Sequence, residues 1–198
     1  MIVLIGVSFM MGLLSSSEIM QRSVDAYCDE TSMMDFEILS PYGFNDDDLE
    51  AIRREEFVSK AVAGRSFDCG MLLGGSFQGT VRVEEYERAL NRFELISGRY
   101  PEKENECLIL YREDDPLYAE GTEIVLSLEG EDVLKSIRTD TYLITGVVKT
   151  PDYMSKMLGT SMYRNRELDT VIYVPARDLI FASLSASQSI FTPISVLF

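Results

Sequence analysis

Hydrophobic and polar positions divide this chain into two regions. The first 14 residues, MIVLIGVSFMMGLL, contain no charged side chain and almost no polar one. The rest of the chain alternates short apolar runs with acidic residues and with turns rich in glycine, proline and asparagine. This pattern predicts one apolar helix followed by a folded domain with many short strands.

The apolar stretch is short for a membrane span. Its 14 residues would cover roughly 21 Å as a helix, whereas a bilayer core is about 30 Å thick and needs about 20 residues. We favour a transmembrane helix whose beginning precedes Met1. A signal-peptide core is the second interpretation, but it needs basic residues before the apolar run, and the first basic residue here is Arg22. A buried helix of a soluble domain is the third.

The residues after the apolar stretch indicate its orientation. The segment from Glu18 to Glu30 is acidic, and Arg22 is its only basic residue. Cytoplasmic flanks are enriched in lysine and arginine, so this flank favours the extracytoplasmic side for the rest of the chain. Apolar residues recur at helical spacing between residues 17 and 30, which predicts a helix leaving the membrane or an amphipathic linker.

The next segment predicts a small β-α-β element. Met34–Ser40 alternates apolar and polar residues like a strand. Asn45 can cap a helix whose first turn is Asp46–Asp48, and residues 58–73 carry a second strand or a bent pair of strands. The three aspartates lack the alternating ligands, central glycine and distant glutamate of a calcium loop, so we interpret them as helix-end electrostatics.

The remaining elements are predicted to be strands joined by turns. Gly74–Gly79 lacks the lysine of a phosphate-binding loop and the GxGxxG fingerprint, so a hairpin turn is expected. Residues 87–96 fit either a short helix or a strand. Further expected features are strands at 79–86, 106–110, 142–149, 170–174 and 191–198, a turn at Gly121 followed by a strand to Leu128, a polar turn at 129–132, a long loop at 151–167, a short helix from Pro175 toward Phe181, and a low-complexity stretch at 183–189.

Composition excludes several function classes. The chain has 33 acidic and 18 basic residues and a net charge of −15, which argues against nucleic acid as a partner. It has no histidine, which removes Ser-His-Asp and Cys-His catalysis. Cys28, Cys69 and Cys107 are far apart and form no metal or redox motif, so buried single thiols are expected rather than a disulfide. Carboxylate chemistry such as glycoside cleavage stays open, but no acidic pair stands out. The sequence therefore predicts no catalytic residue, no cofactor and no metal ligand, and a protein that is not an enzyme.

Two stretches are candidates for function. In SGRYPEKENEC, Gly98 and Pro101 end one element and aim the next, and Glu106 is expected either to pair with Arg99 or to accept backbone N–H groups. A binding site is the functional alternative for that pair, but a structural role is favoured. The stretch Tyr153–Tyr163 is rich in methionine, which suits a contact surface, although cover for the sheet core is favoured.

Several stretches follow a pattern known from one family. The most specific is SGRYPEKENEC, with Gly98, Arg99, Pro101, Asn105 and Glu106 at the expected positions. The others are Met1–Leu14, the juxtamembrane helix with Tyr27, ILSPYGFNDDDLEAI at 38–52, the turn with Tyr118 and Gly121, Gly146–Met154 and Tyr173–Pro175. Together they resemble the N-terminal portion of the MacB-like extracytoplasmic (periplasmic core) domain of FtsX-like ABC transporter permeases. Tyr163–Glu167 departs from the glycine-rich passage that the family often has there, so that loop is expected to differ in shape.

The resemblance implies a domain organisation and a fold. Residues 1–17 would form the outer part of a transmembrane helix, 18–33 a juxtamembrane helix or linker, and 34–198 the MacB-like domain, incomplete at its C-terminus. The expected fold class is α+β, with a partial transmembrane helix, a mixed and mostly antiparallel β-rich domain, and the small β-α-β element.

The resemblance also implies a function at the cell membrane, with the main domain on the extracytoplasmic side. The chain would be part of a permease subunit that relays conformational change or contacts a substrate or partner protein outside the membrane. The implied partners are the lipid bilayer, a cytoplasmic ABC ATPase reached through other parts of the permease, and an extracytoplasmic substrate or partner protein. A stand-alone membrane-anchored or secreted binding module without a transport role is the alternative.

Overall fold

The computed structural model describes residues 2–40, 43–87, 89–113, 119–128, 137–155, 157–161, 163–179, 190–191 and 193–198. Several features named above lie outside these residues: Met1, Tyr118, the polar turn at 129–132, Phe181 and the low-complexity stretch at 183–189, together with residues 41–42 of the stretch 38–52 and residue 162 of the stretch Tyr153–Tyr163.

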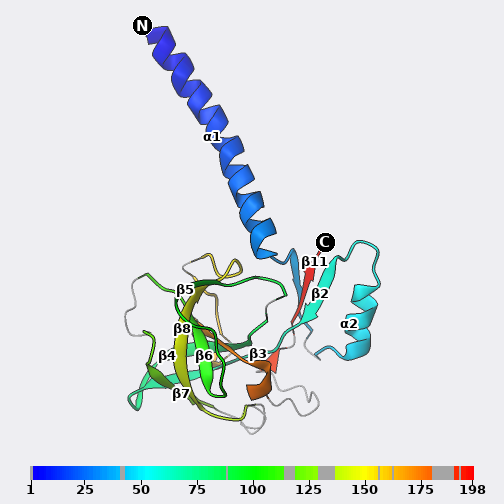
Figure 1. Cartoon of the computed structure of the whole chain (residues 1–198), viewed down its shortest axis with the longest axis vertical. Helices are drawn as coiled ribbons and strands as arrows, with labels where there is room; N and C mark the ends of the chain where they lie inside the picture. The colour runs from blue at the N-terminus through cyan, green and yellow to red at the C-terminus, as the bar shows by residue number, and fades with distance from the viewer. Residues whose placement is uncertain are drawn as a thin grey trace.

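A single long helix leaves the folded part of the molecule. The helix α1 runs from Ile2 to Thr31 and extends away from the strands (Figure 1). Its 30 residues correspond to a length of about 45 Å. By length and composition it can cross a membrane, with a mean hydropathy of 1.7. Its side chains from Val3 to Val24 are exposed, so α1 is not the buried core helix that the third interpretation of the sequence required.

A small sheet of three strands lies beside the base of α1. Its strands are β1 (Phe36–Ile38), β2 (Lys60–Ala63) and β11 (Ile194–Leu197), in the order β1-β11-β2. Because β11 is antiparallel to both neighbours, β1 and β2 run parallel to each other. With the helix α2 (Asp46–Arg53) between them in sequence, they form the predicted β-α-β element, completed by a strand from the other end of the chain.

The helix α2 begins as predicted. Asn45 Oδ1 accepts a hydrogen bond from the backbone N–H of Asp48 at 2.9 Å, and Asp48 Oδ2 accepts one from the N–H of Asn45 at 3.0 Å. This reciprocal capping box satisfies two backbone donors that a helix leaves open at its start. Leu49 and Ile52 then pack against the small sheet. The aspartates at 46–48 form the first turn of this helix, as predicted.

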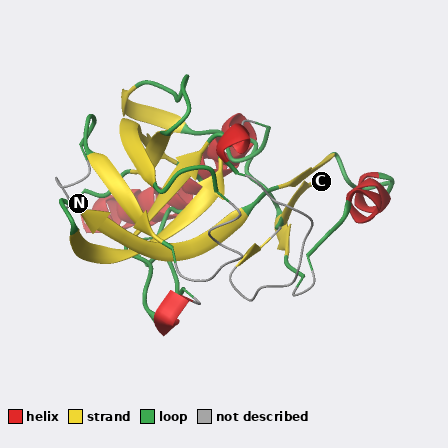
Figure 2. Ribbon diagram, turned by 90° about the horizontal axis from the view of Figure 1, so that it is seen from below, coloured by secondary structure: helices red, strands yellow, loops and turns green. Residues whose placement is uncertain are grey.

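The larger sheet closes into a barrel. Six strands pair in a ring, in the order β3-β4-β9-β6-β8-β7 and back to β3, and two strands extend it, β10 beyond β3 and β5 beyond β8 (Figures 1 and 2). Only the pairs β4–β9 and β6–β8 are parallel among the described strands. The bounds are β3 Ser66–Leu73, β4 Ser76–Glu85, β5 Glu94–Gly98, β6 Glu106–Leu110, β7 Glu123–Ser127, β8 Thr141–Lys149, β9 Thr170–Val174 and β10 Ile190–Phe191.

The barrel has a packed interior and a partly covered exterior. Inward-facing side chains such as Phe67, Met71 and Ile144 are fully buried and form the largest hydrophobic cluster. Alternate residues of β6 and β9, including Leu108 and Tyr173, point outward and are covered by a second cluster that contains Phe93. Opposite faces of the same strands are therefore both buried, which explains why these strands read as continuous apolar runs.

Three strand predictions are resolved or corrected. The ambiguous stretch 87–96 contains the start of the strand β5, and no helix is present in its described residues. The single strand expected at 191–198 is wrong: β10 and β11 belong to different sheets and lie on either side of Pro193, whose missing N–H and fixed φ interrupt a ladder. The strand at Met34–Ser40 is shorter than expected, because the N–H of Met34 binds the side chain of Asn91 instead of a neighbouring strand.

Shorter features match expectation. The turn at residues 74 and 75 joins β3 to β4 as a hairpin, and both glycines have positive φ. The long loop at 151–167 contains one 3-10 turn, Tyr163–Asn165, and a second 3-10 turn, Ala176–Asp178, follows Pro175. Cys28, Cys69 and Cys107 are free thiols; Cys69 and Cys107 are buried as expected, whereas Cys28 is only half-buried. Burial raises the pKa of Cys69 and Cys107 in the barrel core well above the usual range of a thiol, so both are inert side chains of the core.

Candidate functional site at the base of the anchor helix

One loop of the barrel holds the end of α1. This junction loop, residues 89–93, connects β4 to β5. The carbonyl of Thr31 accepts a hydrogen bond from the N–H of Arg92 at 2.7 Å, and the carbonyl of Ser32 accepts one from the N–H of Asn91 at 3.0 Å. The last carbonyls of a helix have no partner within the helix. Here the N–H of Arg92 in the barrel supplies the partner of the last carbonyl of α1, that of Thr31, while the carbonyls of Cys28 and Asp29 accept N–H groups of the turn after the helix. The helix α1 is thus attached to the domain through its terminal carbonyl.

Asn91 is the central residue of the junction loop. It has a φ of +47°, a left-handed conformation that asparagine adopts more readily than most residues. Its Oδ1 accepts a hydrogen bond from the N–H of Met34 at 2.9 Å, and its Nδ2 lies 3.4 Å from Asp152 Oδ2. Asn91 therefore contacts the chain leaving α1 through its amide oxygen, and the segment after β8 through its amide nitrogen.

The small sheet is attached to the same loop. Lys60 at the start of β2 donates a hydrogen bond from Nζ to the carbonyl of Ala89 at 2.6 Å. The junction loop thus receives contacts from α1, from the segment before β1, from β2 and from the segment after β8. A movement of any of these elements acts on the loop that the other three share.

A cavity of about 240 Å³ lies beside the junction loop, between the small sheet and the outer face of the barrel. Met34, Asn91 and Phe93 form part of its wall. Glu84 on β4 and Asp152 after β8 also face it. The cavity therefore lies where the small sheet, the barrel and the segment that leaves α1 meet.

The carboxyl groups of this cavity have unusual proton affinities. Burial raises the pKa of Glu84 to about 8, with further rises from the charges of Asp152 and Glu37 and partial offsets from the Tyr153 hydroxyl and Arg82. Burial also raises the pKa of Asp152 to about 6, and Glu37 adds to that rise. The Tyr153 hydroxyl donates to Glu84 Oε1 at 2.6 Å. Glu84 thus holds its proton more tightly than an ordinary glutamate.

An ion pair fixes the long loop at 151–167 to the barrel. Arg82 donates to both carboxylate oxygens of Asp68, from Nε at 2.7 Å and from Nη2 at 3.1 Å. The buried Ser161 donates to the same carboxylate at 2.7 Å, and its hydroxyl oxygen accepts from the N–H of Tyr163 at 2.9 Å. Because Asp68 is almost fully buried, this bidentate pairing compensates the cost of burying its charge.

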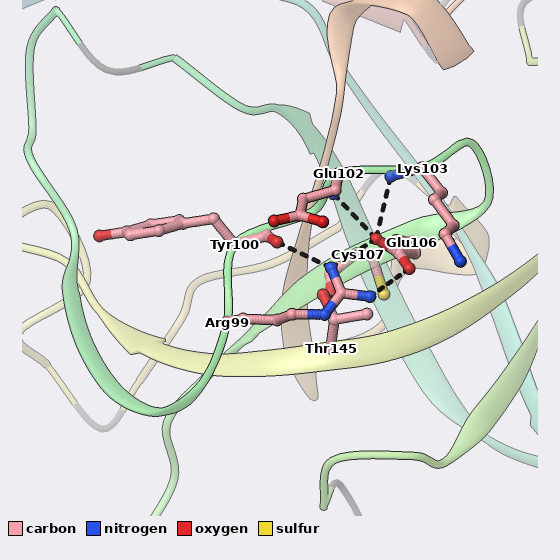
Figure 3. Close-up of polar contacts among 7 residues, drawn as sticks. All are labelled: Arg99, Tyr100, Glu102, Lys103, Glu106, Cys107 and Thr145. Atoms are coloured by element: carbon pink, nitrogen blue, oxygen red, sulfur yellow. Dashed lines mark hydrogen bonds and ion pairs between the residues drawn. The ribbon is translucent and has the colours of Figure 1, made fainter.

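The Arg99–Glu106 pair lies at another edge of the barrel, between β5 and β6. Arg99 donates to Glu106 from Nη2 at 2.5 Å and from Nη1 at 2.9 Å, and Nη1 also donates to the carbonyl of Tyr100 at 3.1 Å (Figure 3). The N–H groups of Glu102 and Lys103 donate to Glu106 Oε2 at 2.8 and 3.0 Å. Both sequence-based alternatives for Glu106 therefore occur together.

The donors around Glu106 have an electrostatic consequence. The hydrogen bonds from Arg99, helped by the two backbone N–H groups and opposed by burial, lower the pKa of Glu106 to about 2. Gly98, which precedes Arg99, lets the two backbones of β5 and β8 lie close together. It has a φ of +80°, and a Cβ there would lie 2.2 Å from the carbonyl oxygen of Thr145. Donors of the same turn occupy the acceptor positions of the Glu106 carboxylate, which favours a structural role for the pair.

The methionine-rich stretch serves two purposes. Tyr153 and Leu158 pack against the outward-facing side chains of the barrel. Met154 and Met157 are 63% and 81% exposed. The stretch therefore covers the sheet at some positions and presents apolar side chains to solvent at others, and its use as a contact surface stays a prediction.

A closed barrel and a small sheet at the end of one long apolar helix define a membrane-anchored α+β domain. The family model for the MacB-like periplasmic core domain matches residues 1–196. The chain therefore belongs to the MacB-like periplasmic core domain family, whose members are extracytoplasmic domains of ABC transporter permeases. Its domain lies on the extracytoplasmic side of the membrane.

Two solved structures are similar to this chain at low identity. The extracellular domain of the noncanonic ABC-type transporter YknZ from Gram-positive bacteria is 12% identical, with 80% of this chain and 74% of that chain covered and a TM-score of 0.44. The periplasmic region of MacB from Actinobacillus actinomycetemcomitans is 10% identical, with 78% and 64% covered and a TM-score of 0.41. A comparison with curated proteins finds no match.

Sequence reasoning found one of these sites and missed the other. Arg99 and Glu106 meet as expected because they flank one turn. The junction loop and its cavity went unnoticed, because Glu84, Asn91 and Asp152 are far apart in sequence and no motif links them. The ambiguous pattern around residues 87–96 was the one available signal, since a stretch without clear periodicity indicates a loop, and loops carry a large share of functional residues.

Proposed function

We propose that this domain relays conformational change between the membrane and the extracytoplasmic side of an ABC transporter permease. Its N-terminal part, residues 1–17, acts as the outer part of a transmembrane helix, residues 18–33 act as the stalk, and residues 34–198 form part of the extracytoplasmic domain. The attachment of the α1 backbone to the junction loop supports this role. A cytoplasmic ATPase, reached through other parts of the permease, drives the movement.

The stiffness of α1 and the contacts shared by the junction loop both suit a relay. A helix of 30 residues transmits tilt and displacement along its length, because its backbone hydrogen bonds lie within the element. At its end, the carbonyls of Thr31 and Ser32 bind the junction loop, which is also bound by Lys60 of the small sheet. Such an arrangement suits rigid-body rotation of packed parts about a small interface. It needs no catalytic residues, and we assign none.

Asn91→Ala tests this proposal. The variant removes the side-chain contacts to Met34 and Asp152 but leaves the two backbone hydrogen bonds in place. In the permease reconstituted with its ATPase, a fluorophore at Glu123→Cys on β7 reports its distance from labelled lipids of the outer leaflet, in a Cys28→Ser background. We expect ATP to change the energy transfer, and the Asn91→Ala change to be about half as large or smaller, since the loss of two hydrogen bonds loosens the attachment.

A matched control separates coupling from stability. Asn45→Ala removes the side-chain cap of α2, one hydrogen bond to the N–H of Asp48, but it leaves the junction loop intact, so its ATP response should equal that of the unmodified chain. An equal response in Asn91→Ala would contradict the relay. No ATP response in the unmodified complex would instead favour the alternative, a membrane-anchored binding module without a transport role.

A further inference from the structure

The lining of the cavity beside the junction loop carries excess negative charge. Among its described charged residues, the two arginines are both engaged by carboxylates: Arg82 binds Asp68 in two places, and Arg65 lies 3.4 Å from Glu85. Five acidic residues line the same cavity, namely Glu37, Glu84, Glu85, Glu87 and Asp152.

Three of these acidic residues reach the cavity from separate elements, and Glu37 is the exposed one of the three. Glu37 comes from β1, Glu84 from β4 and Asp152 from the segment after β8. Side chains of alternating positions explain the direction of Glu37: its neighbours Phe36 and Ile38 lie on the other face of the small sheet, while Glu37 lines the cavity. The negative charge is thus assembled by the packing of the small sheet against the barrel.

A buried hydroxyl supplies an observation independent of charge. Tyr173 is 2% exposed and lines the cavity. None of the described residues forms a well-aligned hydrogen bond with its hydroxyl. Burial raises the pKa of this hydroxyl and the nearby Thr150 hydroxyl lowers it in part, but the Thr150 hydroxyl donates to Asp152. Buried polar groups are nearly always hydrogen-bonded in folded proteins. An unpartnered hydroxyl beside three carboxyl groups therefore indicates a polar ligand that the cavity is built to take.

The remaining wall selects among cations. Among the described residues, no group of three or more histidine, cysteine, aspartate or glutamate residues is arranged to hold a metal ion. Phe93, Tyr153 and Tyr173 contribute aromatic rings to the wall, and Met34 contributes an apolar side chain. Aromatic faces attract cations, and apolar walls suit a hydrocarbon chain. This combination fits an organic cation with several N–H donors.

We propose that this cavity binds a small primary alkylammonium ion. Its ammonium group has three N–H donors, and the carboxyl groups of Glu37, Glu84 and Asp152 that line the cavity attract it and supply acceptors. The Tyr173 hydroxyl lies within the same polar region, and the alkyl chain lies against Phe93 and Met34. The volume of about 240 Å³ accommodates a chain of a few carbon atoms. The cavity shares Asn91 with the relay, but ligand binding and the transmission of movement are measured by different experiments, so either property can fail without the other.

Calorimetric titration with butylammonium tests the site. The full chain is held in lipid nanodiscs, empty nanodiscs provide the reference, and 1-butanol serves as the neutral probe of similar shape. We expect a saturable heat with butylammonium and none with 1-butanol. Glu84→Gln should weaken binding about tenfold or more, and Tyr173→Phe about threefold, which are typical losses for a charged and a neutral hydrogen-bonding group.

Glu123→Gln is the matched control for charge. It removes one negative charge from the exposed face of β7, away from the cavity, so binding should stay within about twofold of the unmodified chain. Thermal unfolding of each variant verifies that the domain is intact. Equal weakening by Glu123→Gln and Glu84→Gln would show attraction to the overall charge and overturn the site, as would equal heats with butylammonium and 1-butanol.

Proton release gives a second readout. Binding of a cation favours the charged form of Glu84, so at pH 7 the ligand should expel a proton, and affinity should rise between pH 6 and pH 9. The groups that face Glu84 are Asp152, Glu37, Tyr153 and Arg82. Asp152, with a pKa of about 6, contributes to the lower part of this range. Titration in two buffers of different ionisation enthalpy measures the released protons, and a pH-independent affinity would overturn the proposal.

Discussion

Glu106 and Glu84 are two glutamates of the same barrel whose environments shift their pKa in opposite directions. Glu106 receives a guanidinium fork and two backbone N–H groups, and its pKa falls to about 2. Glu84 receives one tyrosine hydroxyl and faces two further carboxyl groups, and its pKa rises to about 8. The comparison teaches that the donors converging on a carboxyl group, rather than its burial alone, separate a structural acid from one available to a ligand.

The largest expected effect is on the free energy of unfolding, and it comes from changing the backbone beside Arg99, the partner of Glu106. Gly98→Ala forces a φ of +80° on a residue with a Cβ and places that Cβ against the Thr145 carbonyl, so we expect a loss of about 3 kcal/mol in the free energy of unfolding. Gly121→Ala is the control, because its φ is +81° but no heavy atom lies within 4 Å of the new Cβ. Urea unfolding measures both, and equal losses would contradict the role of the close approach.

The next effect removes the acid itself. Glu106→Gln keeps the shape of the side chain but loses the charge that Arg99 binds, and we expect it to cost about 2 kcal/mol at pH 7. A carboxyl pKa that is lower in the folded state stabilises the fold above the unfolded value of about 4.3, and the stabilisation is lost as pH falls toward about 2. The difference between variant and unmodified chain should therefore shrink between pH 5 and pH 2 in urea unfolding. A constant difference would exclude the charge as the cause.

A smaller effect on the free energy of unfolding, with the opposite dependence on pH, is expected at Glu84. A carboxyl pKa that is higher in the folded state favours folding at low pH, and this advantage is lost as pH rises from about 4.3 through 8. Glu84→Gln, which resembles the protonated acid, should match the unmodified chain near pH 4 and exceed its stability above pH 8, by on the order of 1 kcal/mol. Glu84→Gln that is less stable at pH 9 would show that the charged form of Glu84 stabilises the fold.

The smallest effect concerns an exposed acid with one backbone donor. Asp48 accepts the N–H of Asn45 at the start of α2 but lies in solvent, so Asp48→Ala should cost about 0.5–1 kcal/mol. Asp47→Ala is its control, since Asp47 shares the first helical turn without taking part in the capping box. Chemical unfolding of both variants measures the difference, and equal costs would assign the effect to general helix-end charge.

The sequence predicted the local elements well because their causes are local. The capping residue Asn45, the apolar runs of β6 and β9, and the pair Arg99 and Glu106 each act within a few residues. The class, α+β with a mixed and mostly antiparallel sheet, follows from the same short-range patterns.

What the sequence did not predict depends on contacts between distant residues. The strand β7 closes the barrel by pairing with β3 and β8, and no periodicity reveals which strands are neighbours. The cavity requires Glu37, Glu84 and Asp152 to meet, although more than 40 residues separate each from the next. In a chain with 33 acidic residues, the sequence alone does not show which carboxyl groups packing brings to the same cavity.

The position of β11 has a consequence for how the molecule forms. Because β11 lies between β1 and β2, neither of these strands has its neighbour in the small sheet until about 130 further residues have been synthesised, and pairings over such separations form slowly. During translocation the barrel strands can assemble first, while β1 and β2 stay exposed beside α1. The small sheet, and with it one wall of the cavity, should be the last part to close and the part most in need of protection from aggregation.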